Sequence, residues 1–131
     1  MNLDTQRTRL ETEFAALMTA TYPNLVMIGE NADIDPVEES EWLRMSITVI
    51  DVIYPCIGSD HEQTDAIFNV QIFTRLGIGA SQASKLADAA KSALKTGSYE
   101  GISVQSFDIS TGVVEADWFS LILRATYRAQ A

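Results

Sequence analysis

The chain has 131 residues, of which 47% are hydrophobic and 21% are charged, which is the composition of an ordinary globular protein. Its single cysteine, Cys56, excludes an intramolecular disulfide framework and a metal site built from several cysteines. No apolar run reaches the roughly 20 residues that a membrane-spanning helix needs. The charged N-terminal segment predicts no secretion signal. We therefore expect one domain over residues 1–131, with no membrane partner.

The net charge of −9 is unevenly distributed along the chain. Residues 10–74 hold twelve acidic residues and one basic residue, Arg44, which gives this segment a charge of −11. Such a chain repels a phosphate backbone, so we expect no specific nucleic-acid binding. The simpler interpretation of the charge is solubility. The sharper interpretation is a surface that must stay near nucleic acid without adhering to it.

The first predicted helix begins near Asp4 or Thr5, either of which can cap it, and ends at Tyr22 because Pro23 follows. Its apolar residues repeat with helical spacing and form a single stripe, which predicts that the helix packs against another element. The stripe consists of Leu10, Phe14, Leu17 and Met18.

Three strands are predicted next. A short apolar run at 25–28 suits a strand and is followed by an acidic loop over 29–41. Alternation of apolar and polar residues then predicts strands over 41–49 and 66–74. The turn-rich residues 54–65 connect these two strands, and they form a long connection for a hairpin.

A second helix follows the strand that Gly77 and Gly79 terminate. Ser81 can cap this helix, and Gly97 suits the position after its end. Lys91 and Lys95 lie in the last turns, where they complement the helix dipole. The predicted buried face consists of Ala83, Leu86, Ala87, Ala90 and Leu94. Residues 102–109 and 118–128 are predicted to form the last two strands.

The predicted order is α-β-β-β-α-β-β, which indicates an α+β fold with both helices packed on one face of a mixed, mainly antiparallel sheet. The other face of the sheet combines aromatic and arginine residues. This composition is typical of interface centres, although lone exposed aromatic residues are also common on ordinary surfaces. The candidate interface residues are Trp42, Arg44, Phe73, Arg75, Trp118, Arg124 and Arg128.

Motifs for catalysis or cofactor binding are weak. His61 and Cys56 share a loop, but nothing in their spacing enforces a catalytic pair. The acidic residues after Asn31 begin like a calcium loop, which then fails at Pro36 and Trp42. The Gly77–Gly79 turn lacks the third glycine of a dinucleotide site, since position 82 is glutamine. We therefore predict no catalytic residue, no cofactor and no metal ligand.

Several short motifs, densest over residues 66–129, resemble those of the tail terminator and tail-completion proteins of long-tailed bacteriophages. In that family a strand runs into a Gly-x-Gly turn, a helix rich in alanine and leucine follows, and an aromatic-rich strand closes the chain. The matching segments here are Gln71–Thr74, Gly77–Gly79, Ala83–Ala89, Trp118–Phe119 and Tyr127–Ala129.

The resemblance implies a structural virion protein without enzymatic activity or a cofactor. It implies a ring, commonly a hexamer, that caps the tail tube, stops tube polymerisation and provides the surface that joins the head. The implied partners are further copies of the chain, the major tail tube protein and a head-completion or connector protein. The implied location is the virion tail, with assembly in the host cytoplasm.

With a ring implied, the acidic segment becomes a candidate lining for the channel through which the genome passes. The candidate lining residues are Asp33, Asp35, Glu38, Glu39, Asp60, Glu62 and Asp65. Two alternatives stay open at this point. One is a head–tail connector (neck) or tube-type protein, and the other is a small α+β ligand-binding domain or enzyme that uses the Gly77–Gly79 turn.

Overall fold

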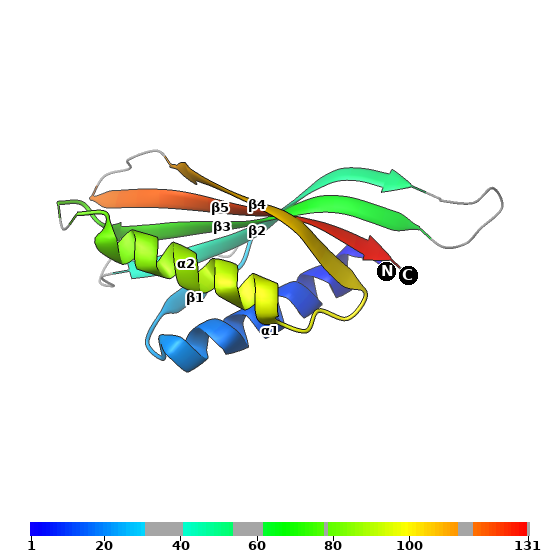
Figure 1. Ribbon diagram of the computed structural model, residues 1–131, viewed down its shortest axis with the longest axis horizontal. Helices are drawn as coiled ribbons and strands as arrows, with labels where there is room; N and C mark the ends of the chain where they lie inside the picture. Colours follow the sequence, from blue (N-terminus) through cyan, green and yellow to red (C-terminus); the bar gives the residue numbers. More distant parts are fainter. Residues whose placement is uncertain (31–40, 54–61, 78, 113–116, 131) are drawn as a thin grey trace.

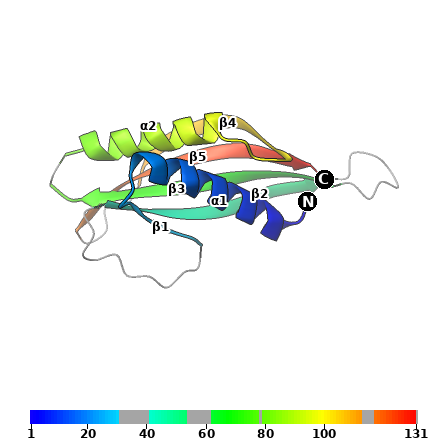
Figure 2. The same cartoon turned by 90° about the horizontal axis from the view of Figure 1, so that it is seen from below.

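The computed structural model describes residues 1–30, 41–53, 62–77, 79–112 and 117–130. The chain forms two helices and a five-stranded sheet, in the predicted order α-β-β-β-α-β-β. Both helices lie on the same side of the sheet (Figures 1 and 2), which confirms the α+β class. The elements are α1 (Leu3–Thr21), β1 (Val26–Ile28), β2 (Glu41–Ile53), β3 (Gln63–Arg75), α2 (Ser81–Thr96), β4 (Ile102–Thr111) and β5 (Trp118–Gln130).

The N-cap of helix α1 lies two or three residues before its predicted caps. Asn2 is the N-cap, and its side-chain oxygen accepts a hydrogen bond from the Thr5 backbone N–H at 2.8 Å. Asp4 and Thr5 are therefore inside the helix, and the prediction that either caps it is wrong. The predicted stripe is largely confirmed, because Leu10, Phe14 and Met18 are buried. Helix boundaries depend on which side chain reaches the free N–H groups, and Asn2 also suits that role.

The sheet is mixed and has the strand order β1-β2-β3-β5-β4. The short β1 pairs with β2 in parallel, and the other three pairings are antiparallel. Both central strands are longer than predicted, since β2 continues to Ile53 and β3 already begins at Gln63. Residues 63–65 therefore belong to a strand and not to the predicted connection.

The core lies between the helices and one face of the sheet. Alternate residues of β3 from Ala66 to Ile72 are fully buried, as the period of two predicts. Across the sheet they are in register with buried residues of β2 and β5, for example Val70 with Met45 and Leu123. Phe14 of α1 meets Phe68 edge to face, with ring centroids 5.6 Å apart. This layer fixes the position of both sheet edges relative to the helices.

The helix α2 packs closely on the sheet through small residues. Ala83, Ala87 and Ala90 are buried, together with Leu86 and Leu94. The predicted cap is wrong, because the N-cap is Ala80 and no side chain caps this end. Ser81 is already helical, so its hydroxyl does not occupy the N-cap position.

The turn before α2 requires its two glycines for conformational reasons. Gly77 has φ of 94° and Gly79 has φ of 87°, which is the left-handed region that other residues adopt with strain. A β-carbon at either position would meet no heavy atom within 4 Å, so the requirement comes from the backbone and not from packing. The sharp change of direction between β3 and α2 accounts for this motif without a bound phosphate.

Candidate assembly surfaces

Five of the seven candidate interface residues meet at one end of the outer sheet face, the face opposite the helices. Trp42 of β2 and Phe73 of β3 are direct cross-strand partners. Their rings stack with centroids 3.9 Å apart and an interplanar angle of 6°. Trp118 of β5 meets Trp42 edge to face at 5.9 Å. Because cross-strand neighbours share a face, the strand register alone brings these three rings together.

Two arginines complete this aromatic–arginine cluster. The guanidinium of Arg44 lies 5.2 Å from the centroid of the Trp42 ring, and that of Arg75 lies 4.2 Å from the Trp118 ring. Cation–π contacts of this kind contribute about 0.5–1 kcal/mol at exposed sites. Trp42 and Phe73 are buried, Trp118 is half-buried and Arg44 is exposed. The cluster therefore exposes positive charge to solvent, while most of its aromatic surface is buried beneath.

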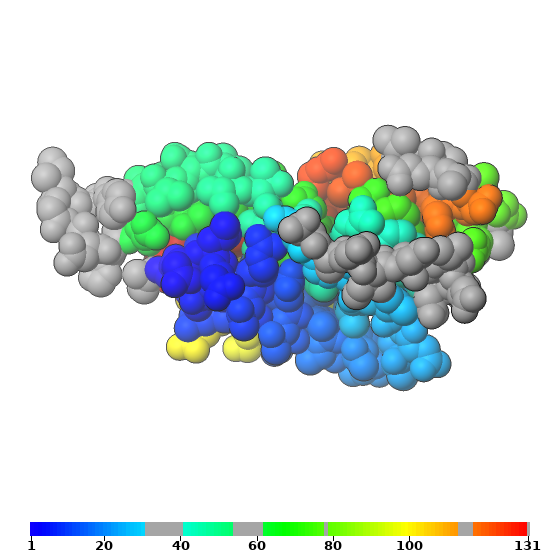
Figure 3. Space-filling view, turned by 180° about the vertical axis from the view of Figure 1, so that it is seen from behind, coloured from blue at the N-terminus to red at the C-terminus, as the bar shows by residue number. Residues whose placement is uncertain are grey.

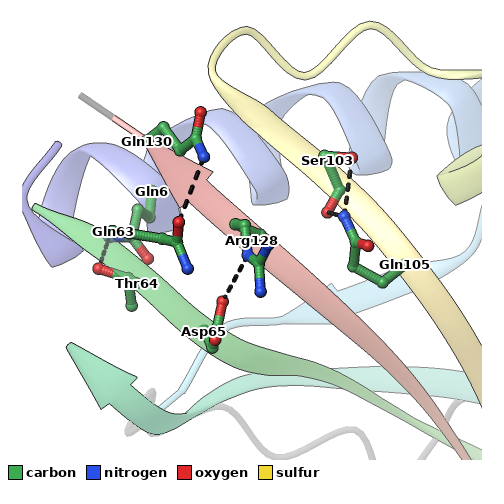
Figure 4. A network of polar contacts seen from close by, with 8 residues as sticks. All are labelled: Gln6, Gln63, Thr64, Asp65, Ser103, Gln105, Arg128 and Gln130. Carbon is green, nitrogen blue, oxygen red and sulfur yellow. Dashed lines mark hydrogen bonds and ion pairs between the residues drawn. The ribbon is translucent and has the colours of Figure 1, made fainter. Parts of the chain in front are cut away.

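The two remaining candidate arginines lie elsewhere on the outer face, and each is paired with an acid. Arg128 of β5 donates to Asp65 of β3 at 2.9 Å (Figure 4). Arg124 lies 3.7 Å from the Asp108 carboxylate and also donates to Ser110. The hydrogen bond and charge of Asp65 raise the pKa of Arg128. Exposed ion pairs contribute little to stability, so their main effect is to offset charge on this face.

Only part of the candidate acidic lining falls within the described residues. Asp65 is half-buried and shares its charge with Arg128. Glu62 lies just before β3 and is also half-buried. The other five candidates lie outside the described residues, namely Asp33, Asp35, Glu38, Glu39 and Asp60.

The residues considered for catalysis are partly outside the described chain as well. Cys56, His61 and the acidic stretch that follows Asn31 are among them. Within the part of the chain that the structure describes, no group of three or more His, Cys, Asp or Glu side chains could hold a metal ion. No helix of the described residues is long and apolar enough to cross a membrane.

Sequence reasoning missed an exposed apolar surface at the end of β2. Val49, Ile50, Val52 and Ile53, here named the β2-end patch, are 42%, 57%, 47% and 37% exposed. Among the described residues, β1 pairs with β2 only at Trp42–Arg44, so this part of the strand lies at an open edge. The apolar run Val-Ile-Asp-Val-Ile beside a turn-rich segment was the available signal.

A groove on the opposite edge of the sheet was also not predicted. It has a volume of about 430 Å³ and lies between the end of α2 and β4. Its apolar wall comes mainly from Leu94, Tyr99, Val104 and Phe107, and Lys95 lies at its margin. We name it the α2–β4 groove. On the outer side of the same strand, a second hollow of about 570 Å³ is lined by residues including Ser103, Gln105 and Arg128 (Figure 4).

Comparison with known proteins identifies the family. A solved structure whose name states no function superposes with a TM-score of 0.76 at 18% identity, covering 100% of this chain and 97% of that chain. At this identity the likeness shows the fold alone. Comparison with curated protein sequences gives no match. The family model described as phage tail terminator protein matches residues 7–99, which is more than half of the chain. The chain therefore belongs to the phage tail terminator family and has a structural role in a phage tail.

Proposed function

We propose that this protein forms a ring, with six copies as the expected number, that caps the tail tube, stops its polymerisation and offers the surface that joins the head. The observation that carries this proposal is the family match over residues 7–99. The partners are then copies of the chain, the major tail tube protein and a head-completion or connector protein. Assembly takes place in the host cytoplasm, and the ring has no enzymatic activity and needs no cofactor.

The geometry of the described residues supports a ring in a general way. A ring requires two different surfaces on each subunit, because head-to-tail contacts must close by rotation. The open part of β2 lies near one edge of the sheet and β4 forms the other edge. The aromatic–arginine cluster lies on a third surface, the outer face. We propose that this cluster, with Arg124 and Arg128 beside it, contacts a partner of the assembled tail.

The acidic segment fits a channel through which DNA passes. We propose that some of the seven candidate acids line this channel, where they repel the genome and prevent adhesion. Asp65 would contribute less than a full charge, because Arg128 offsets part of it. A structure of the ring in which all of these acids lie on the outer rim would overturn this part of the proposal.

Tail length is the measurement that tests the function. Loss of the gene from its phage should give tails of uncontrolled, excessive length, and purified protein added to tails during assembly should restore a uniform length. Tails of normal length that fail to join heads would instead indicate the connector alternative. A protein that stays monomeric on tail tubes and binds a nucleotide tightly would indicate a ligand-binding domain at the Gly77–Gly79 turn.

A further inference from the structure

The β2-end patch and the α2–β4 groove are complementary in chemistry. The patch presents four exposed apolar side chains on a strand end, and the groove presents an apolar wall of half-buried and buried residues. Figure 3 shows the end of β2 as a continuous surface beside the start of α1. Several exposed apolar side chains grouped at one strand end are a candidate interaction surface.

The patch cannot fill the groove of its own chain. β2 and β4 are separated by β3 and β5 in the strand order, which places them three strand spacings, or about 14 Å, apart. Both strands are fixed in one sheet with the core layer behind it. The apolar side chains of one copy can therefore reach only the groove of another copy.

The direction of the side chains agrees with such a contact. Val49 and Val52 are in register with Ala66 and Thr64, which are buried on the helix side of the sheet. In β4, Val104 and Phe107 are in register with Tyr127 and Ala125, which are buried on that same side. If the β2 end of a second copy continued the sheet beyond β4, then Val49 and Val52 would face into the groove.

The charges beside the two surfaces are opposite. All three lysines of the chain lie on α2, and Lys95 lines the groove while the Lys91 ammonium lies 5.7 Å from the Phe107 ring. The patch contains an exposed acid, Asp51, between its two pairs of apolar residues. Asp51 is in register with Asp65 on the outer face, so in this contact it lies toward Arg128 on the outer side of β4. In a chain of net charge −9, copies otherwise repel one another, so this local complementarity favours one relative orientation.

Bulges in both strands limit what else can bind there. The register shifts between Val49 and Asp51 in β2 and between Val104 and Ser106 in β4. Gln105 at the second shift folds back to donate to Ser103 Oγ at 2.9 Å (Figure 4). Bulges discourage indiscriminate strand pairing at a sheet edge. The contact would therefore depend more on side chains that fit the groove than on a long ladder of backbone hydrogen bonds.

We infer that neighbouring copies of this chain bind head to tail, with the β2-end patch of one copy seated in the α2–β4 groove of the next. Val49 and Val52 enter the groove, and Asp51, on the outer side of the sheet, lies toward the hollow that Arg128 lines. The contact is heterologous, so repetition around an axis closes a ring. This inference rests on the proposed function and specifies which surfaces of the subunit build the ring.

Charge placement tests the contact. Val52→Lys brings a cation against Lys95 and should weaken self-association by about tenfold or more, because like charges facing each other are strongly unfavourable in an interface. Lys95→Glu in the same chain should restore association. Leu76→Lys is the matched control, since Leu76 is 53% exposed and lies outside both surfaces. Sedimentation velocity measures association, with circular dichroism to verify the fold, first on the purified protein and then with isolated tail tubes.

Disulfide crosslinking tests which surfaces meet. In a Cys56→Ser background, a Val52→Cys copy mixed with a Val104→Cys copy should form a mixed disulfide, and neither copy alone should crosslink efficiently. Crosslinking of Val52→Cys with itself would overturn the inference. If the wild type forms rings that stop tail growth and Val52→Lys forms them equally well, the inference fails and the proposed function stands. If the wild type never associates, even on tail tubes, both fail.

Discussion

At the scale of single residues, the core contains a polar side chain whose position depends on three hydrogen bonds. Gln6 of α1 is 1% exposed. Its amide nitrogen donates to Thr64 Oγ1 at 3.2 Å and to the Met1 carbonyl at 3.1 Å, and its oxygen accepts from the Tyr127 hydroxyl at 2.9 Å. These bonds join the first helix to β3 and β5. The helical spacing of apolar residues could not reveal this, because the partners are 58 and 121 residues away.

Tyr127→Phe should lower the free energy of unfolding by about 1–3 kcal/mol, since it leaves the buried Gln6 oxygen without its donor. Burial raises the pKa of Tyr127 to about 12, so the hydroxyl remains a donor throughout the usual pH range. Urea unfolding measures the change. The double variant that combines Tyr127→Phe with Gln6→Met should lose less free energy of unfolding than the sum of the losses in the two single variants. Strict additivity would contradict a direct coupling.

Glu11→Gln should stabilise the protein at neutral pH. Burial raises the pKa of Glu11, Glu30 adds to the shift and Arg7 opposes it. The folded state therefore binds the proton more tightly than the unfolded state, and the contribution of this group to stability is lost as the pH rises through the raised pKa. The gain in the free energy of unfolding of Glu11→Gln over the wild type should be present at pH 7 and become smaller as the pH falls. Urea midpoints at several pH values test this, with the exposed Asp88→Asn as the control.

At the scale of elements, periodicity and one short apolar run predicted both helices, the five strands and most of the buried face. The ends of the elements were predicted less well, because they depend on which side chain reaches a free backbone group or on contacts distant in sequence. Ala80 at the start of α2 has an α-helical backbone and no capping side chain, which no cap motif could indicate. The parallel pairing of the three-residue β1 with β2 likewise leaves no local pattern.

The end of α2 depends on a glycine for packing and not for its backbone angle. Gly97 has an ordinary φ of −68°, but a β-carbon there would lie 2.6 Å from Tyr99 Cε2 and 2.8 Å from the Ala93 carbonyl. Gly97→Ala should therefore lower the free energy of unfolding by about 1–3 kcal/mol. Thermal or urea unfolding measures this, and the exposed Ser98→Ala is the matched control. Equal stability of the two variants would contradict the close approach of the Tyr99 ring.

At the scale of the whole molecule, the family could be recognised from short motifs, whereas the surfaces could not. Strand alternation identified the aromatic and arginine residues of the outer face. The stacking of Trp42 on Phe73, however, follows only from the register between two strands. The β2-end patch depends on how far β2 extends past β1, and the α2–β4 groove depends on the spacing between a helix and a strand. Both are products of tertiary structure.

Unfolding should be a single cooperative transition, as expected for one domain of this size. Both tryptophans of the chain, Trp42 and Trp118, belong to the cluster on the outer face, whereas circular dichroism reports all helices and strands. Tryptophan fluorescence and far-ultraviolet circular dichroism should therefore give the same urea midpoint. Separate midpoints would indicate that the outer cluster unfolds independently of the main core.

The confinement of every lysine to α2 has a practical consequence for chemical labelling. Amine-reactive reagents can modify the polypeptide only along this one helix and at the amino terminus. Mass spectrometry after brief acetylation therefore gives a footprint of a single flank of the subunit. If that flank becomes occluded when particles mature, Lys95 and Lys91 should lose reactivity while Lys85, nearer the other end of the helix, retains more of it.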